Sequence, residues 1–310
     1  MSLVASLIQQ AMLSAVPLAL AGSGELAAQR AGVINVGIEG LMLVGCIAGF
    51  AVAALTGNAW LGLGAAIAAG AGLAAGFAWA TVFARADQIV CGMAVNLLAV
   101  GISGTAWAAL QGTGHDQLAP GAGFAPLAML GTIPWVGGLL AGQYGLAYVT
   151  LALMALLGWM FARTRAGLIV RALGDAPDAC AAAGIRVRAW RMATVTAAGA
   201  CAGAAGAYLS VMRVHGFAPE MTGGQGFLVL ALVVFGRWRV AGLFAGCLLF
   251  GFLEAIQQHL QGSGMNALVP YQLLKALPYV AALVALAVLS RSAPGPARLG
   301  QAWPPGAFRG

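Results

Sequence analysis

Apolar residues in this chain come in runs of roughly 20, the length that a helix needs to cross a hydrocarbon core about 30 Å thick. A membrane β-barrel would instead require short segments in which apolar and polar residues alternate, and that alternation is absent. Only 7% of the 310 residues are charged, whereas an ordinary soluble domain carries about 25%. The sequence therefore predicts an all-α fold, a polytopic membrane helix bundle.

Nine apolar segments follow one another along the chain. They cover roughly residues 3–21, 34–56, 59–84, 88–110, 144–162, 191–212, 226–236, 240–260 and 271–290, and the seventh is too short to span a bilayer by itself. We expect one transmembrane domain over residues 1–290 that includes broken or half-length helices. The proline-rich residues 291–310 are expected to form a disordered cytoplasmic tail, and the stretch containing Pro120, Pro126 and Pro134 an external loop with an interfacial helix.

Basic residues are unevenly distributed between the loops. If alternate loops face the cytoplasm, beginning after the first segment, thirteen of the fifteen basic residues lie inside, and only Arg213 and Lys275 lie outside. Orientation by Lys and Arg produces such a bias, so the sequence predicts an outside N-terminus and an inside C-terminus. Topology thus accounts for the net charge of +7, and no nucleic-acid partner is expected. The inside set is Arg30, Arg85, Arg163, Arg165, Arg171, Arg186, Arg188, Arg191, Arg237, Arg239, Arg291, Arg298 and Arg309.

The sequence contains no recognisable energy-converting or catalytic machinery. An ATP-hydrolysing P-loop needs a lysine directly after a glycine, but the only lysine, Lys275, follows Leu274. The five cysteines show no CxxC spacing and the three histidines are far apart, so neither a metal site nor a cofactor is expected. We expect that the chain is not an enzyme, and that energy for any uphill transport enters through a partner.

The first candidate site is the sequence Arg30-Ala-Gly-Val-Ile-Asn-Val-Gly-Ile-Glu-Gly40. In a helix, Asn35 and Glu39 would share one face, and Gly37 would loosen the backbone between them. An ionisable residue at the membrane centre costs about 2.5–3.5 kcal/mol on insertion scales, so it needs a partner or water. Two roles stay open: the polar groups line a solute path, or Glu39 pairs with Arg30 or another basic group and only holds the fold.

The second candidate is the arginine-flanked cytoplasmic loop over residues 163–191. Pro177 at a first helical position, Asp178 in the first turn and a following alanine run predict a short helix, with Gly184 as its stop. Such a helix could dock into a groove of a soluble partner, or the loop could be a charged connection only. The candidate docking residues are Arg171, Gly174, Asp175, Pro177, Ala181, Gly184 and Ile185.

The third candidate is the glycine-rich approach to the short seventh segment, which ends at Gly236. Non-helical backbone at membrane depth is tolerated only inside protein or beside a cavity, so this stretch predicts a second broken helix opposite the first site, or tight packing alone. Asn96 is an amide in the middle of the fourth segment, and it either bonds a neighbouring helix or faces the path. The candidate path residues are Asn35, Gly37, Glu39, Asn96, Gly224, Gln225 and Phe227.

Four phrases, at residues 30–40, 86–99, 171–178 and 222–227, occur in an order that resembles permease subunits of ABC importers. The branch is the one that takes up nucleosides and simple sugars, with ribose and branched-chain amino acid permeases as more distant relatives. The resemblance covers roughly residues 10–290. The chain differs from that pattern at Gln88, Cys91, Cys180 and Gln225, where an acidic residue, a serine, an alanine and an arginine are usual.

The resemblance implies a permease of the bacterial cytoplasmic (inner) membrane, surrounded by lipid, that works by alternating access. Residues 175–185 would be the coupling helix in a groove of an ATP-binding subunit. A second, similar permease would pair with the chain, and a periplasmic or lipid-anchored binding protein would deliver the solute. A neutral polar solute such as a nucleoside is expected; a sugar or a branched-chain amino acid is the alternative, and a membrane scaffold without a transport path is the rival of another class.

Overall fold

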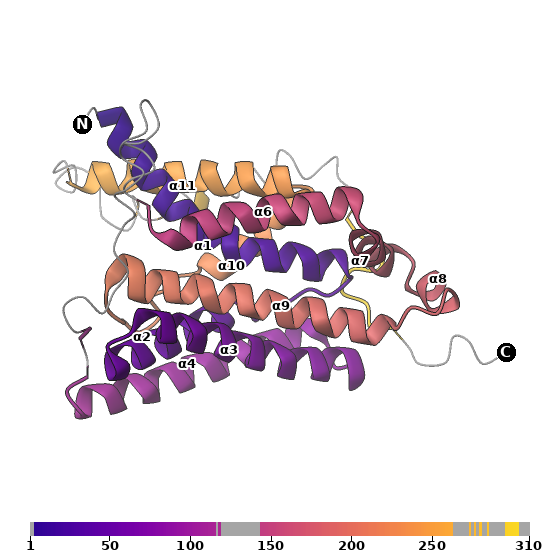
Figure 1. Cartoon of the computed structure of the whole chain (residues 1–310), viewed down its shortest axis with the longest axis horizontal. Helices are drawn as coiled ribbons and strands as arrows, with labels where there is room; N and C mark the ends of the chain where they lie inside the picture. The colour runs from indigo at the N-terminus through magenta and orange to yellow at the C-terminus, as the bar shows by residue number, and fades with distance from the viewer. Residues whose placement is uncertain are drawn as a thin grey trace.

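The computed structural model describes residues 3–115, 117–118, 143–262, 273, 276, 279–280, 284 and 295–303. Within these ranges the regular elements are all helical, and seven helices are long and apolar enough to cross a membrane. Figure 1 shows the long helices running along the longest axis of the molecule, with the start of α1 and the short helix α8 at opposite ends. The predicted helical membrane bundle is confirmed.

The helices follow the predicted segments, with two short additional helices within residues 163–191. Two of the long helices end in π-helical turns, η1 after α3 and η3 after α9. The elements are α1 Leu3–Arg30, α2 Ile38–Thr56, α3 Ala59–Ala78, η1 Trp79–Phe83, α4 Gln88–Gly112, α6 Gly145–Arg163, α7 Arg165–Asp175, α8 Pro177–Ala182, α9 Val187–Ala207, η3 Tyr208–Val214, α10 Gln225–Phe235 and α11 Val240–Gly262.

Three segment boundaries differ from the sequence prediction, one of them the start of the sixth segment, where α9 begins at Val187 rather than at residue 191. The first helix extends to Arg30 rather than ending near residue 21, because its polar side chains Ser23, Glu25 and Gln29 are buried in protein instead of facing lipid. The second helix begins at Ile38 rather than at residue 34. The half-length seventh segment is confirmed as α10. Most of the expected ninth segment, 271–290, and the expected proline-containing outer loop lie outside the described residues.

Small residues let α9 pack closely against its neighbours. A Cβ at Gly203 would overlap the Ala66 carbonyl oxygen of α3, and one at Gly199 would overlap the Ala74 side chain. Such close backbone approach is the usual way in which helices associate in lipid. The spaced pair Gly72 and Gly76 does not take part, since a Cβ at either position would meet nothing within 4 Å.

The end of the molecule that the sequence predicts to face the cytoplasm carries a well-defined cap. The amphipathic helix α7 and the short helix α8 project from it beside residues 295–303, drawn in yellow in Figure 1. We call residues 295–303 the terminal strap. Main-chain bonds join Arg298 N to the Gly174 carbonyl at 2.8 Å and Gly300 N to the Gly32 carbonyl at 3.1 Å. For these residues the structure differs from the expected disordered tail.

Candidate functional site

The half-length helix α10 starts in the interior of the bundle, after a non-helical stretch over residues 215–224. Four residues of this stretch have a positive φ: His215 at 55°, Glu220 at 54°, Gly223 at 56° and Gly224 at 89°. Two of the four are glycines, which accept left-handed positions without strain. The glycine-rich approach predicted from the sequence therefore forms the turn that starts α10.

An aromatic cluster fixes the same stretch against the bundle. Phe217 lies between Phe50 of α2 and Trp107 of α4, with ring centroids 6.5 and 5.4 Å apart. Phe50 is fully buried and Phe217 is 7% exposed. Aromatic pairs at such separations add to the free energy of simple burial. The turn is thus anchored on the two helices that also carry Glu39 and Asn96.

Glu39 caps α10 from another part of the chain. Its Oε1 accepts a hydrogen bond from Gly224 N at 2.8 Å and its Oε2 one from Gly226 N at 2.6 Å. Gly224 is the N-cap residue of α10 and Gly226 lies in its first turn; N–H groups at this end have no intrahelical partner, and the helix dipole favours a negative charge there. The expected alternative, a pair between Glu39 and Arg30, is wrong, because Arg30 donates to the Trp238 carbonyl instead.

Asn96 joins α4 to the start of α2. Its Oδ1 accepts a bond from Gly40 N at 2.8 Å, and its Nδ2 donates to the Val36 carbonyl at 3.1 Å. The helix contact is close, since a Cβ at Gly40 would lie 2.9 Å from the Ala99 methyl carbon. Of the two roles open for Asn96, the bond between neighbouring segments is therefore present.

Glu39 and Asn96 also border a hollow of about 310 Å³. Of the seven predicted path residues, the structure brings four to it: Glu39, Asn96, Gly224 and Phe227, whose ring is 44% exposed. No Lys, Arg or His is among the described residues that line it. The other lining residues are Gly40, Leu43, Met93, Leu97, Val100, Glu220, Thr222 and Gly223.

The remaining three predicted path residues do not line the hollow. Asn35 is fully buried, and its main-chain N–H donates to the Glu25 carboxylate at 3.3 Å. Gly37 N donates to Asn35 Oδ1 at 3.1 Å. Asn35 and Glu39 do not share a helix face, because α2 begins only at Ile38. Gln225 is the first residue of α10, and its buried Oε1 has no partner among the described atoms.

Sequence reasoning missed the apolar wall of the hollow. Met93, Leu97 and Val100 stand three or four residues from one another along α4, on the face that also carries Asn96. Their helical spacing relative to Asn96 could have identified them from the sequence as neighbours of a path residue. Glu220 and Thr222, from the turn before α10, had no comparable signal, since their position depends on the left-handed turns.

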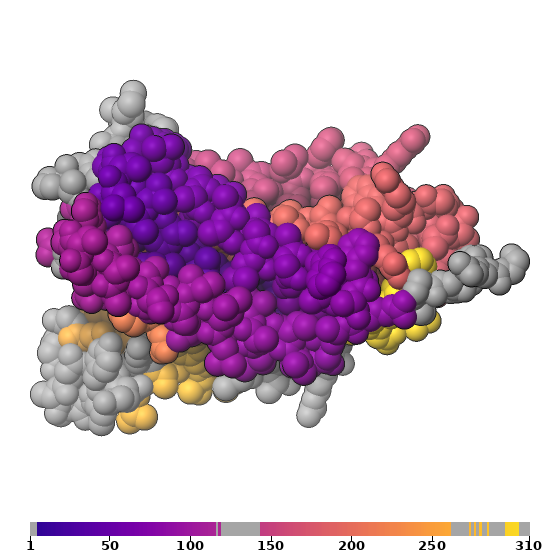
Figure 2. All heavy atoms as spheres, turned by 90° about the horizontal axis from the view of Figure 1, so that it is seen from below, coloured from indigo at the N-terminus to yellow at the C-terminus, as the bar shows by residue number. Residues whose placement is uncertain are grey.

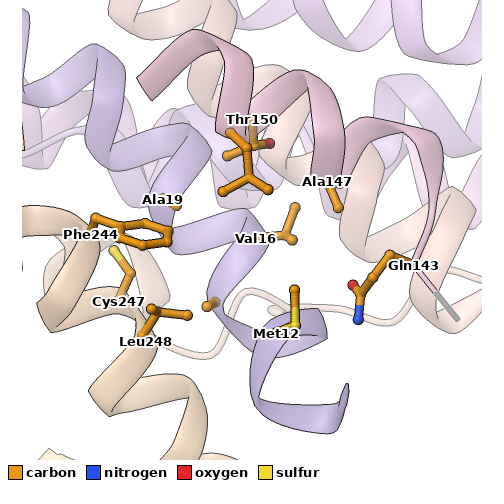
Figure 3. A pocket seen from close by; sticks show the side chains of 11 residues that line it. Met12, Val16, Ala19, Gln143, Ala147, Thr150, Phe244, Cys247 and Leu248 are labelled. Atoms are coloured by element: carbon orange, nitrogen blue, oxygen red, sulfur yellow. The ribbon is translucent and has the colours of Figure 1, made fainter. Parts of the chain in front are cut away.

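A second, smaller pocket of about 50 Å³ lies between α1, α6 and α11. Figure 3 shows Gln143 at one end and Phe244 with Cys247 at the other, with Val16 between them. Its walls are almost entirely apolar, and the hydroxyl of Thr150 donates to its own helix at Leu146. Gln143, whose buried Oε1 has no partner among the described atoms, and Thr150 are the polar side chains that line it, so a polar solute would regain few of the hydrogen bonds that it loses with its water, and the hollow beside Glu39 is the better candidate.

The predicted short helix of the cytoplasmic loop is confirmed as α8. Pro177 is its first residue, Asp178 lies in its first turn, and Gly184 follows its end with a φ of 79°. The preceding helix α7 was not predicted. Residues Ala179, Ala182, Ala183 and Gly184 are exposed, and α8 is the outermost labelled helix at its end of the molecule (Figure 1).

The seven predicted docking residues range from exposed to buried, and three of them, Arg171, Ala181 and Ile185, are partly buried. Asp175 and Gly184 are exposed, whereas Gly174 and Pro177 are buried. Ala181 and Ile185 pack against a small buried cluster formed by Leu173, Cys180 and Val187. Arg171 Nε donates to the Gly167 carbonyl within α7, at 3.3 Å. Only part of the predicted set can therefore touch a partner directly.

Comparisons with known proteins place the chain in a family. Residues 7–289 match the family of permease components of branched-chain amino acid transport systems. A provisionally assigned glucose ABC transporter permease of Haloferax volcanii is 35% identical, over 94% of this chain and 92% of the relative. No solved structure matches.

Two further relatives are named as permeases for nucleosides. A nucleoside ABC transporter permease of Lactococcus lactis is 29% identical over 94% of each chain. A guanosine ABC transporter permease of Bacillus subtilis is 30% identical over 92% of this chain and 89% of its own. With its helical bundle and the family match over nearly the whole sequence, the chain belongs to this permease family and is a multi-pass permease subunit of an ABC importer in the cytoplasmic membrane.

Proposed function

We propose that the chain is the permease subunit for a neutral polar solute, with a nucleoside as the first candidate. We further propose that this solute passes the hollow beside Glu39. The exposed ring of Phe227 at the hollow supports this choice, because a nucleobase stacks on an aromatic face. The Glu39 carboxylate is already engaged by two main-chain N–H groups. Among the described residues, the wall therefore offers a stacking surface and hydrogen-bonding groups but no Lys, Arg or His side chain that would select an anion.

The hollow supplies one wall of a path that a second, homologous permease completes. Its α4 side is open at the surface, where Leu97 is 73% exposed and Met93 47%. Figure 2 looks onto the lower side of Figure 1 and shows α3 and α4, in purple, along this face. Pairing of two such faces would enclose the solute and allow alternating access between outward- and inward-facing states.

The ATP-binding subunit engages α8. The exposed alanines Ala179 and Ala182 give this helix a smooth tip that can enter a groove, and the buried cluster under α8 supports it from behind. A periplasmic or lipid-anchored binding protein delivers the solute from the other side. Hydrolysis of ATP then takes place in the partner, and this chain makes and breaks no covalent bond.

Radiolabelled uptake in cells that express the complete complex tests this function. The solutes to compare are guanosine, glucose and a branched-chain amino acid. The variant is Ala179→Asp, which places a charge on the exposed tip of α8, and the matched control is Ala189→Asp on an exposed position of α9. Ala181 is not used for this substitution, because it packs against the cluster under α8 and a charge there would disturb the fold itself.

We expect guanosine uptake in the wild type, its loss in Ala179→Asp and its retention in the control, with equal protein in the membrane. Glucose uptake without guanosine uptake would replace the nucleoside by a sugar, which the 35% identical relative makes the second candidate. Uptake of none of the three by an assembled wild-type complex would contradict the proposal. Unchanged uptake in Ala179→Asp would refute the coupling role of α8.

A further inference from the structure

The terminal strap lies across the inner helix pair and is bonded to both members. Ala297 N donates to Asp175 Oδ1 at 3.1 Å, at the end of α7. Trp303 Nε1 donates to Asp178 Oδ1 at 2.8 Å, in the first turn of α8. Both carboxylates belong to the segment proposed to meet the ATP-binding subunit. The strap therefore determines where that segment can sit.

Arg191 of α9 binds the strap, α7 and the end of α1 together. It is 2% exposed, and its guanidinium donates to three carbonyl oxygens: Ala31 at 3.0 Å, Gln301 at 3.0 Å and Leu173 at 3.4 Å. Arg30 and Asp175 end α1 and α7, so two of these carbonyls lie at helix C-termini, where the dipole favours a cation. Arg191 is in no ion pair among the described residues.

The strap also closes the apolar cluster behind α8. Leu173, Cys180 and Val187 form its buried core, and Trp303 packs against them from the strap. Cys180 is 4% exposed, and burial raises the pKa of its thiol. A displaced strap would open this cluster to water, so Cys180 is a natural reporter of the position of the strap.

The connection that the strap holds leads to the hollow. Residues 31–37 join α1 to α2, and the Gly32 carbonyl at one end accepts the bond from Gly300 N. At the other end, Val36 is bonded to Asn96, and Glu39 follows in the first turn of α2 with its hold on α10. The same short connection thus touches the strap and the candidate solute site.

We propose that Arg191 and the terminal strap fix the inner helix pair and the 31–37 connection as one rigid unit. Movement imposed on α8 is then delivered to the Glu39 hollow instead of being absorbed by the loop. Arg191 is a positioning residue in this arrangement, since it touches neither solute nor ATP. The inference rests on the proposed function for its coupling part, whereas the packing of the strap can be tested without transport.

The first experiment measures how fast a water-soluble maleimide labels Cys180 in membranes opened on the cytoplasmic side. The background is Cys91→Ser; the three other cysteines lie inside α2, α9 and α11. Trp303→Ala should accelerate labelling several-fold, whereas Trp303→Phe, which keeps an aromatic ring in the cluster, should stay close to the parent rate. Equal labelling rates in Trp303→Ala and the parent would contradict the inference that the strap shields the cluster around Cys180.

The second experiment measures solute moved per ATP hydrolysed by the complete complex in proteoliposomes. Arg191→Gln and Trp303→Ala should lower this ratio, while the ATP-binding subunit still co-purifies and still hydrolyses ATP. Arg191→Lys should restore part of the ratio, since a lysine keeps the charge but cannot reach three carbonyls. The matched control is Arg298→Ala, which keeps the main-chain N–H that bonds Gly174.

The two experiments separate the possible failures. Parallel loss of transport and hydrolysis at an unchanged ratio would reduce Arg191 and the strap to a structural role and overturn the coupling inference. No transport by the wild-type complex would overturn the proposed function and the coupling part with it. Labelling of Cys180 would then still decide whether the strap lies where we infer.

Discussion

Glu39 shows how one side chain can replace a whole helix turn as a hydrogen-bonding partner. The first N–H groups of any helix lack intrahelical acceptors, and α10 begins at Gln225, directly after a non-helical stretch that offers its first turn no preceding helical carbonyls. The carboxylate of Glu39 accepts bonds from two of the N–H groups at this end, those of Gly224 and Gly226. A Cβ at Gly226 would lie 2.5 Å from the Glu39 main chain, so the two segments are in direct contact.

Glu39→Ala should lower both stability and uptake. It leaves two main-chain N–H groups without their acceptor, and each such group costs about 1–3 kcal/mol. Glu39→Gln keeps one carbonyl oxygen as an acceptor, so its effect should be intermediate. Thermal unfolding in detergent measures the order, with exposed Glu220→Gln as a near-neutral control. A Glu39→Ala protein as stable as the wild type would contradict the capping role.

The sequence predicted that Glu39 was special but not what it binds. A carboxylate in an apolar segment needs a partner, which is enough to single it out. Its partners lie 185 and 187 residues further along the chain and are main-chain groups, which carry no mark in the residue type. Asn35 was misplaced for a related reason, because the start of α2 at Ile38 depends on bonds to distant side chains.

At the scale of elements, α9 is held by backbone contact rather than by large side chains. Gly203 of α9 faces Ala66 and Gly70 of α3, and Gly206 faces the main chain of α2 near Met42. Close approach of this kind leaves no room for an added methyl group. It also makes dispersion contacts along the whole seam, which is how helices gain packing energy when lipid is the solvent.

Gly203→Val should destabilise the bundle strongly, by more than the about 1–3 kcal/mol typical of an overpacked core, because the obstacle is the Ala66 backbone. Gly72→Ala is the matched control on α3, where a Cβ meets nothing and alanine favours the helix. Its unfolding temperature in detergent should equal or exceed that of the wild type. Similar behaviour of both variants would show that the α3–α9 seam is not as close as described.

Elements were predictable where their signals are local. Pro177 and Gly184 determine the start and stop of α8 within a few residues, so the sequence alone located it. Glycines four residues apart, by contrast, do not reveal by their spacing which face meets a neighbour: Gly199 and Gly203 pack against α3, whereas a Cβ at Gly72 or Gly76 would meet nothing within 4 Å. The strap was missed because most of its bonds are made by main-chain groups, and its proline-containing sequence resembles a free tail.

At the scale of the whole molecule, the positions of the arginines agree with the orientation that the sequence predicts. The arginines Arg163, Arg186 and Arg237 lie in or beside the connections near α7, α8 and α10, at the predicted inner side. Arg213 is the described exception, and it is neutralised by Glu254 at 3.1 Å with a further bond to Ser14. A paired and partly buried arginine weighs little in choosing the orientation, so the exception is compatible with an inside C-terminus.

Reporter fusions test this orientation. A fluorescent protein that matures only in the cytoplasm, joined after Gly310, should fluoresce, whereas alkaline phosphatase at the same site should be inactive. Fusion after His115, at the outer end of α4, should give the reverse pattern. The opposite result at both sites would invert the topology and move α8 to the face that lacks ATP-binding subunits.

The cap on α10 has a consequence for biogenesis. Ribosomes add about 5–20 residues per second, so with 185 residues between Glu39 and Gly224 the carboxylate waits roughly 10–40 s for its partner. During that interval the carboxylate of Glu39 in α2 lacks the two N–H donors, of Gly224 and Gly226, that bind it in the folded chain. The insertion machinery must therefore shelter α2 away from lipid until α10 emerges, and release of the early helices is tied to synthesis of the late ones.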